Sequence, residues 1–172
     1  MKNKNKTVWS ARFNNATSKI FEKIGASIDV DKRLFEEDIF GSIVHTKMLA
    51  KQKIIDKKIA KKIIYGLKKI RGEIRKNKFN FNNKYEDIHL NIEKRLFAII
   101  GKDAGYLHIA RSRNDQVITD FKLWIKKASK ETVKNLNDLI KSFLKKSEVN
   151  IQTIMPGFTH LKNAQPISFA HY

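Results

Sequence analysis

The sequence predicts a mainly α-helical fold, in which an N-terminal helical domain is followed by the first long helix of a central helical bundle. Three observations predict this fold. Apolar residues recur every three or four positions along several segments, which is the period of a helix. Both prolines, Pro156 and Pro166, lie near the end of the chain, so no proline interrupts the earlier segments. One periodic segment continues for about six helical turns.

The first predicted helix begins at Asp31 and ends near Lys51, after an irregular, polar stretch over residues 1–30. The Asp31 carboxylate can accept hydrogen bonds from the unpaired N–H groups at a helix start. The apolar side chains of this helix are Leu34, Phe35, Ile39, Ile43 and Met48.

Two further helices are predicted between residues 59 and 101. The second helix has the clearest apolar stripe, and lysines occupy its other faces until Gly72 and Asn77 mark its end. The members of this stripe are Ile59, Ile63, Leu67, Ile70 and Ile74. The third helix extends from about Tyr85 to Ile100 and ends at Gly101. Its inward-facing side chains are Ile88, Ile92, Leu96 and Ile99.

The longest periodic segment predicts a helix from about Gln116 to Lys146. Its apolar face consists of Phe121, Ile125, Ala128, Thr132, Leu136, Ile140 and Phe143. A helix of about thirty residues exceeds the usual length of about 11–12, and is typical of a large bundle shared between subunits. The tail after it contains Pro, Gly and polar residues and shows no convincing strand alternation. We therefore expect an N-terminal helical domain over residues 1–111 and the beginning of a bundle domain over residues 112–172.

The net charge of +19 makes nucleic-acid binding an alternative function. Only 7 of the 36 basic residues are Arg, whereas base recognition favours the planar Arg side chain. The abundance of Lys, Asn and Ile also matches the codons of an AT-rich genome. We attribute the charge to a solvated surface and do not expect a nucleic-acid partner.

The sequence indicates a cytoplasmic protein without a membrane partner. No segment approaches the about 20 consecutive apolar residues that cross a bilayer. The basic start of the chain is not followed by the apolar region of a secretion signal. The absence of cysteine excludes disulfides, thiolate metal sites and a cysteine nucleophile.

Two polar clusters lie where predicted helices begin. Ser27 with Asp29 and Asp31 precedes the first helix, and these side chains also fit a simple helix cap. The segment 111–116 precedes the long helix, and its two Arg side chains at a helix N-terminus would suit a carboxylate ligand. Capping by the amide and carboxylate within that segment is an equal alternative.

The third polar cluster is Thr159 with His160, in a loop between Gly157 and Pro166. A histidine in a polar loop is well placed for proton transfer, although most loop histidines are ordinary surface residues. The other four histidines have no partner at metal-ligand spacing, and no Gly-rich phosphate loop occurs. We therefore expect neither a metal site nor a cofactor.

Five segments of the chain resemble the argininosuccinate lyase family, in the order in which that family has them. The two most specific are SRNDQV at residues 112–117 and MPGFTHLKNAQP at residues 155–166. The others are TVWSARF at 7–13, SIDVDKRLFEEDIFGSIVHTKML at 27–49 and EDIHLNIEKRL at 86–96. The resemblance implies a fumarase/aspartase-like fold, of which this chain would be a truncated N-terminal portion.

The resemblance also implies a reaction. Argininosuccinate would be split by β-elimination into arginine and fumarate without a cofactor, in a homotetramer whose sites combine three subunits. Ser27, Arg113, Asn114 and Thr159 would bind the substrate, and His160 would transfer the proton. Asp87 and His89 would form a supporting polar pair. The family's mobile loop with a catalytic serine has no counterpart in these 172 residues, so the alternative is a non-catalytic helical protein.

The sequence departs from the family pattern at a few positions. Ser10 and Ala11 replace two glycines in the first segment, and Ile109 and Ala110 replace Thr and Gly before the SRNDQV segment. Phe158 replaces Tyr and Lys162 replaces Gln in the last segment. If the replaced glycine at position 110 has a positive φ, alanine there introduces backbone strain.

Overall fold

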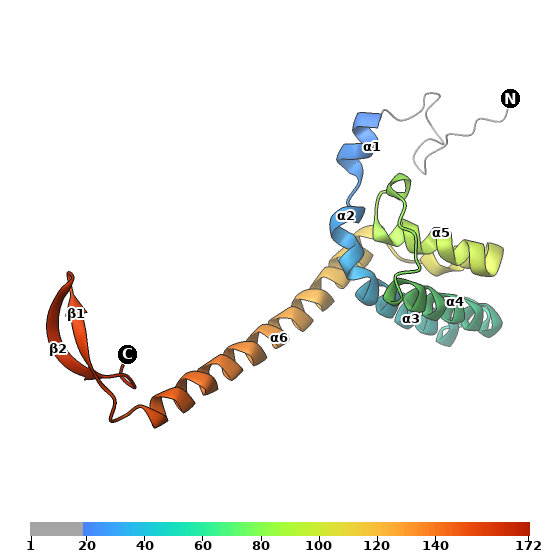
Figure 1. Cartoon of the computed structure of the whole chain (residues 1–172). Helices are drawn as coiled ribbons and strands as arrows, with labels where there is room; N and C mark the ends of the chain where they lie inside the picture. Colours follow the sequence, from blue (N-terminus) through green and yellow to red (C-terminus); the bar gives the residue numbers. More distant parts are fainter. Residues whose placement is uncertain (1–18) are drawn as a thin grey trace. The chain divides into compact units, whose positions relative to one another are not determined.

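The structure is a computed structural model that describes residues 19–172, and it is mainly α-helical as predicted (Figure 1). The chain forms two compact units, of which the first ends at Trp124 and the second covers Ile125–Tyr172. The helices are α1 (Lys19–Gly25), α2 (Ile28–Asp31), α3 (Phe35–Lys51), α4 (Lys57–Arg75), α5 (Ile88–Ile100) and α6 (Arg113–Val149). Short 3-10 segments cover Lys32–Leu34, Asn83–Tyr85 and Gly101–His108, and two strands, β1 (Ile154–Thr159) and β2 (Lys162–Ser168), follow α6.

The core of the first unit lies where α3, α4 and α5 pack side by side (Figure 1). Each helix contributes the apolar stripe that the sequence predicts. The fully buried members are Ile39 on α3, Ile63, Leu67 and Ile70 on α4, and Ile88, Ile92 and Leu96 on α5. Burial of such side chains stabilises a fold by roughly 1.5–3 kcal/mol each, so these stripes hold the three helices together.

The ends of α4 and α5 follow local capping chemistry. The Asp56 carboxylate accepts a hydrogen bond from Lys58 N at 2.5 Å and begins α4. The Asp87 carboxylate accepts one from Leu90 N at 2.6 Å and begins α5. Gly101 has φ 69°, which glycine adopts without strain, and it ends α5 as predicted.

Three local predictions in the first unit are wrong. Residues 19–25 and 28–31 are helical, where an irregular stretch was expected. Asp31 lies inside α2 and its side chain does not cap a helix of its own. Leu49 is fully buried while Met48 is 40% exposed, so the inward face of α3 is shifted by one residue near its end. The resemblance at residues 7–13, with Ser10 and Ala11, lies outside the described residues.

The second unit contains most of α6 and an antiparallel hairpin. Strands β1 and β2 pair from Ile154 with Ser168 to Thr159 with Lys162. The sequence did not predict this hairpin, because Pro156 and Pro166 indicated irregular backbone. In the hairpin, Pro156 and Pro166 are paired opposite each other on the two strands. In a two-stranded sheet both strands are edges, where a missing N–H is tolerated.

The long helix α6 is confirmed and is a few residues longer at each end than predicted. The side chains of its predicted apolar face are exposed except for the half-buried Ala128, and the buried residues of α6 are Gln116 and Asp120. None of the helices in the described part of the chain is both long and apolar enough to span a membrane.

Candidate active site

Ser27 and Asp31 form hydrogen bonds with the backbone around the start of α5. Ser27 N and Ile28 N both donate to Glu86 O, at 2.8 and 2.9 Å. In return, Asp31 Oδ1 accepts a hydrogen bond from Ile88 N at 3.1 Å, while Asp31 Oδ2 accepts one from Ser27 Oγ at 2.6 Å. Asp31 therefore receives an N–H at the start of α5 instead of capping its own helix.

The backbone at Glu86 is strained. Its φ is 56° and its ψ is −61°, and Asp87 N donates to Tyr85 O at 2.5 Å. This is a γ-turn with positive φ, a rare conformation that costs of order 1–3 kcal/mol. The turn directs the Glu86 carbonyl toward Ser27 and places the Asp87 carboxylate close enough to Asp31 to help raise its pKa. Burial is the larger cause of that raised pKa, and the hydrogen bond from Ser27 opposes it.

Arg113 and Asn114 lie in the first turn of α6. Ser112 Oγ accepts a hydrogen bond from Asn114 N at 3.2 Å, so Ser112 caps this helix, and the expected alternative that Asn114 or Asp115 does so is wrong. The Arg113 guanidinium donates to Gln116 Oε1 and to Glu93 Oε1, both at 2.8 Å. These bonds fix its orientation.

The backbone before α6 is held against α3. His45 Nε2 is 2.9 Å from Ile109 O, and Arg111 donates to Ser42 Oγ at 3.2 and 3.3 Å. Ala110 between them has φ 56°. Glycine adopts this left-handed conformation without strain, so Ala110 introduces the backbone strain that we expected for alanine at a position with positive φ.

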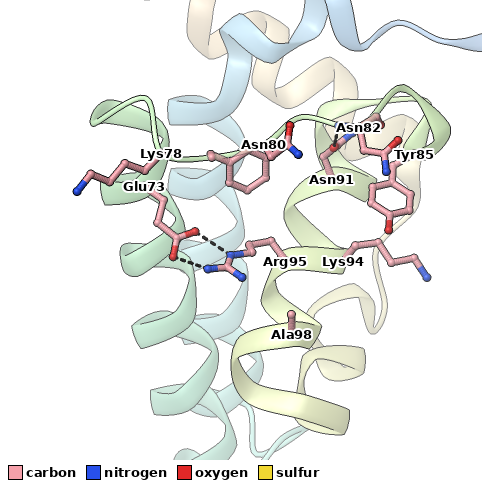
Figure 2. A pocket seen from close by; sticks show the side chains of 10 residues that line it. Glu73, Lys78, Asn80, Asn82, Tyr85, Asn91, Lys94, Arg95 and Ala98 are labelled. Atoms are coloured by element: carbon pink, nitrogen blue, oxygen red, sulfur yellow. Dashed lines mark hydrogen bonds and ion pairs between the residues drawn. The ribbon is translucent and has the colours of Figure 1, made fainter.

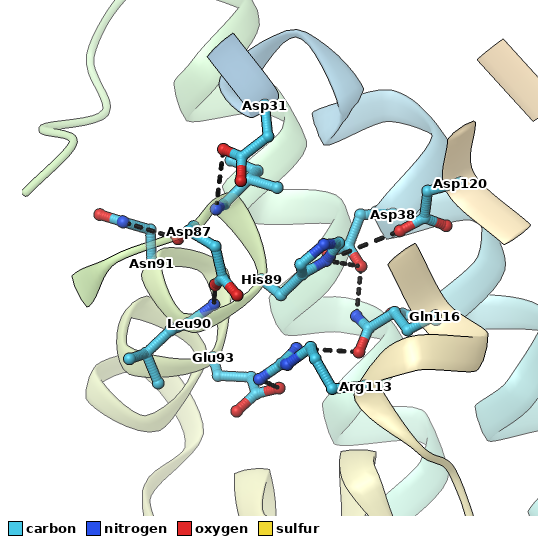
Figure 3. Close-up of polar contacts among 12 residues, drawn as sticks. Asp31, Asp38, Asp87, His89, Leu90, Asn91, Glu93, Arg113, Gln116 and Asp120 are labelled. Atoms are coloured by element: carbon cyan, nitrogen blue, oxygen red, sulfur yellow. Dashed lines mark hydrogen bonds and ion pairs between the residues drawn. The ribbon is translucent and has the colours of Figure 1, made fainter. Parts of the chain in front are cut away.

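His89 belongs to a buried polar centre between α3, α5 and α6 (Figure 3). His89 Nδ1 lies 3.0 Å from Asp38 Oδ1 and 3.6 Å from Asp120 Oδ2. Gln116 Nε2 donates to the same Asp38 oxygen. His89 therefore bonds to Asp38, and its expected partner Asp87 caps α5.

Burial and charge set the protonation of this centre. Burial lowers the pKa of His89, but the hydrogen bond and charge of Asp38 raise it more, so the net direction is upward. Burial raises the pKa of Asp38, but the hydrogen bond and charge of His89 outweigh it and lower it overall. Burial and the neighbouring Asp38 charge raise the pKa of Asp120 to about 8. The opposite directions for Asp38 and Asp120 mean that the two buried carboxyl groups differ in their affinity for a proton.

Within the described part of the chain, Asp38, His89 and Asp120 form a group that could hold a divalent cation, because their ligand atoms lie within 4.8 Å of one another. Two of the three atoms are already engaged with each other, since His89 Nδ1 bonds to Asp38 Oδ1. Gln116 occupies that Asp38 oxygen as well. Internal hydrogen bonding therefore explains the set without an ion.

Sequence reasoning missed this centre, although the sequence carries a signal for it. Polar residues recur at steps of four on three helices that also carry apolar stripes. These residues are Asp38, Ser42 and Thr46 on α3, His89 and Glu93 on α5, and Gln116 and Asp120 on α6. All but Glu93 are buried. A step of four places them on one face of each helix, so the stripe indicates a buried polar contact.

Thr159 and His160 lie in the second unit, at the end of the β-hairpin. Thr159 pairs with Lys162, which leaves His160 and Leu161 as a two-residue turn with φ values of 47° and 63°. Positive φ at both central residues is the type I′ arrangement, which Asn-Gly prefers. Both His160 and Leu161 are exposed. The structure thus displays His160 at a turn, and Ser27, Arg113 and Asn114 belong to the other unit.

A pocket of about 430 Å³ lies elsewhere on the first unit (Figure 2). Arg95 in its wall donates to both carboxylate oxygens of Glu73 at 2.8 Å. Asn91, also in the wall, bonds to the backbone of Asn82 and Asp87. None of the expected substrate-binding residues lines this pocket, and we assign it a structural role in holding the segment before α5.

A family model described as Lyase matches residues 11–172 of the chain. This chain belongs to that lyase family. Among curated relatives of this lyase-family chain, argininosuccinate lyase of Pelagibacter ubique (strain HTCC1062) is 65% identical across the whole chain, and that of Bartonella bacilliformis is 49% identical across 96% of it. The chain spans 37% and 35% of the length of these relatives.

Solved lyases share the fold. An EDDS lyase variant with bound fumarate superimposes with a TM-score of 0.68 at 24% identity, over 92% of this chain and 32% of that protein. A fumarate lyase from Mesorhizobium sp. BNC1 superimposes with a TM-score of 0.61 at 20% identity, over 84% of this chain and 35% of that one. The predicted fumarase/aspartase-like fold is therefore confirmed.

Proposed function

We propose that this lyase-family chain acts in an argininosuccinate lyase, which cleaves argininosuccinate to arginine and fumarate in the cytoplasm. The observation that carries the proposal is the 65% identity to such an enzyme over the whole chain. Because the chain spans only 37% of that relative, the remainder of the site would come from further sequence and from other subunits of a homotetramer.

The proposed reaction is a β-elimination. A base removes the proton from the carbon beside one carboxylate of the succinyl group, and the electrons form the C=C bond of fumarate. The C–N bond to the guanidino group breaks, and an acid protonates that nitrogen to give arginine. The intermediate has two negative charges on one carboxylate, so fixed hydrogen-bond donors must stabilise it.

The residues of this chain would have distinct roles in that reaction. We infer that Arg113 and Asn114 bind a substrate carboxylate, supported by their place at the N-terminus of α6, where the helix dipole favours an anion. Ser27 and Thr159 would supply further donors. His160 would move the proton, which its exposed position at a turn permits.

Complementation tests the proposed function. The chain is mixed or co-expressed with the remaining part of the Pelagibacter ubique enzyme, and fumarate formation is followed by ultraviolet absorbance. We expect turnover from the mixture and none from the chain alone. Asn114→Ala should raise KM in the mixture, because a carboxylate donor acts on the substrate as well as on the transition state. A folded assembly that yields no fumarate would favour the non-catalytic alternative.

A further inference from the structure

The buried polar centre of the first unit takes no direct part in the proposed elimination. Asp38, His89 and Asp120 come from three different helices, α3, α5 and α6, and each is at most 2% exposed. Two carboxylates this close and this deeply buried cannot both remain ionised cheaply, because each loses its hydration and repels the other. The centre must therefore contain a proton that belongs to one of them.

The hydrogen bonds indicate which carboxyl group carries the proton (Figure 3). Asp38 Oδ1 accepts from His89 Nδ1 and from Gln116 Nε2. Asp120 Oδ2 is buried and has no hydrogen-bond partner in the described part of the chain. An ionised oxygen without a donor is costly in the interior, whereas a protonated carboxyl group brings a donor of its own. An oxygen of Asp38 lies within 4.8 Å of one of Asp120, so Asp38 is the nearby carboxylate toward which that donor can turn.

We propose that Asp38 and Asp120 share one proton at neutral pH, and that this carboxyl pair is the positioning element for His89 and Arg113. The proton resides on Asp120 and the negative charge on Asp38, which orients the His89 ring and Gln116. Gln116 Oε1 accepts from Arg113 Nη1 at 2.8 Å, so the orientation is passed to the first turn of α6. The role for Arg113 rests on the proposed function, whereas the shared proton does not.

The surroundings of the pair fit this assignment. A Cβ atom added to Gly41 of α3 would lie 3.3 Å from Asp120 Oδ1, so the glycine provides the room that this carboxyl group occupies. The charged groups that act on the pair are His89 of α5 and Arg111 from the segment before α6, while Asp87 and Arg113 act on His89 itself. Burial lowers the pKa of Arg111, but an arginine keeps its positive charge at neutral pH.

Carboxyl and imidazole NMR titrations of the whole chain test the shared proton. With ¹³C-labelled Asp, one buried carboxyl carbon should titrate at least about two pH units above an ordinary Asp, and the other should titrate below it. The His89 titration midpoint should lie above that of an ordinary histidine. If both buried carboxyl carbons titrate below about pH 5, no proton is shared and the proposal is wrong.

Two isosteric variants separate the two carboxyl groups. Asp120→Asn replaces a neutral group by a neutral one, so it should abolish the high carboxyl titration and leave the His89 midpoint within a few tenths of a pH unit. Asp38→Asn should lower the His89 midpoint by about one to three units, because it removes the opposite charge. Asp138→Asn, on the exposed part of α6, is the control and should change neither. If Asp38→Asn does not fold, the titrations of the wild type and of Asp120→Asn still show whether the two carboxyl groups share a proton.

A metal ion is the competing occupant. If stoichiometric Zn²⁺ broadens or shifts the His89 resonance, and a chelator reverses the change, a cation rather than a proton fills the centre and the proposal is overturned. Unchanged spectra with Zn²⁺ support it. These readouts come from the chain itself, so they remain valid whether or not the complemented enzyme forms fumarate.

The positioning role has its own readout in the complemented enzyme. Loss of the Asp120 proton at high pH should place a second negative charge beside Asp38 and disturb His89 and Gln116. Activity should therefore fall on the alkaline side in the wild type, and Asp120→Asn, which cannot ionise, should extend the active range by at least about one pH unit. An identical pH profile for wild type and Asp120→Asn, together with equal kcat and KM, would show that the pair does not position the site.

Discussion

Ala110 has a backbone conformation that is unfavourable for a residue with a Cβ atom. Its φ of 56° lies in the left-handed region, where an L-residue with a Cβ costs roughly 1–2 kcal/mol. Hydrogen bonds on both sides hold this segment in place: Ile109 O accepts from His45 Nε2, and the Arg111 side chain donates to Ser42 Oγ. The strain is therefore imposed by the contact of this segment with α3.

Ala110→Gly should raise the free energy of unfolding by up to about 1 kcal/mol. Relief of the left-handed strain favours glycine, while the greater freedom of glycine in the unfolded chain offsets part of that gain. Urea unfolding followed by circular dichroism measures the change. The control is Ala98→Gly on the exposed side of α5, which should lower stability by about 1 kcal/mol. Equal destabilisation by both variants would contradict strain at Ala110.

The buried polar centre should make the first unit more stable in mild acid than in mild base. Asp120 keeps its proton up to about pH 8, whereas the unfolded chain loses it near the ordinary value of 3.8, so stability falls as the pH rises between these values. His89 has a raised pKa, so its contribution is complete below the ordinary 6.5 and is lost above it. Asp38 has a lowered pKa, so its contribution is lost only in stronger acid.

We therefore expect the free energy of unfolding to be greatest near pH 4 and to fall by several kcal/mol toward pH 8, because each pH unit in which only the folded chain keeps the Asp120 proton costs about 1.4 kcal/mol. Urea unfolding at a series of pH values at constant salt measures it. Asp120→Asn should flatten most of this slope. A wild-type chain that gains stability from pH 5 to pH 8 would refute the assignment.

At the scale of elements, the β-hairpin combines a strained turn with the proposed proton-transfer residue. A type I′ turn needs positive φ at both central residues, and His160 and Leu161 occupy them with side chains that oppose it. Asn tolerates this conformation better than most residues. His160→Asn should therefore preserve the hairpin and reduce kcat of the complemented enzyme by about 10²–10⁴-fold, because Asn cannot exchange a proton.

Leu161→Gly is the matched variant of that experiment. It relieves strain at the second turn position and leaves the imidazole of His160 in place, so it should strengthen the hairpin without a comparable loss of kcat. Backbone chemical shifts and amide exchange of β1 and β2 report the hairpin in each variant. Full activity of His160→Asn with an unchanged pH profile would remove the proton-transfer role from His160.

The sequence predicted helices more reliably than it predicted polar contacts. The stripes of α4 and α5 gave their buried faces, since Ile63, Ile70 and Ile92 are all fully buried. The hairpin was not predicted because its turn lacks the usual Asn-Gly sequence and its strands contain proline. The buried polar centre was not predicted because Asp38 and His89, which form a hydrogen bond, are 51 positions apart in the sequence. Local periodicity does not encode such a contact. We predicted that Asp31 caps its own helix, whereas it accepts a hydrogen bond from Ile88 N of α5. This contact also joins residues that are far apart in the sequence.

At the scale of the whole molecule, the most prominent unsatisfied feature is the apolar face of α6. In the second unit, Leu136, Ile140 and Phe143 are 52%, 54% and 65% exposed, although they recur at the spacing of a buried helix face. Exposed apolar patches larger than a few hundred Å² mark interaction surfaces in soluble proteins. A helical bundle would bury this face, which fits the proposed homotetramer.

We expect the chain on its own to self-associate through this face. Light scattering should give a mass above the 20.0 kDa of one chain at micromolar concentration. The double variant Ile140→Gln and Phe143→Gln should shift it toward the monomer, because it removes apolar area while Gln preserves the helix. The control, Lys141→Gln with Lys145→Gln, changes neighbouring exposed positions of the same helix without removing apolar residues, and it should not reduce the mass. A wild-type chain that is monomeric and binds no apolar dye would mean that the face is stable in water, and the bundle would then need another driving force.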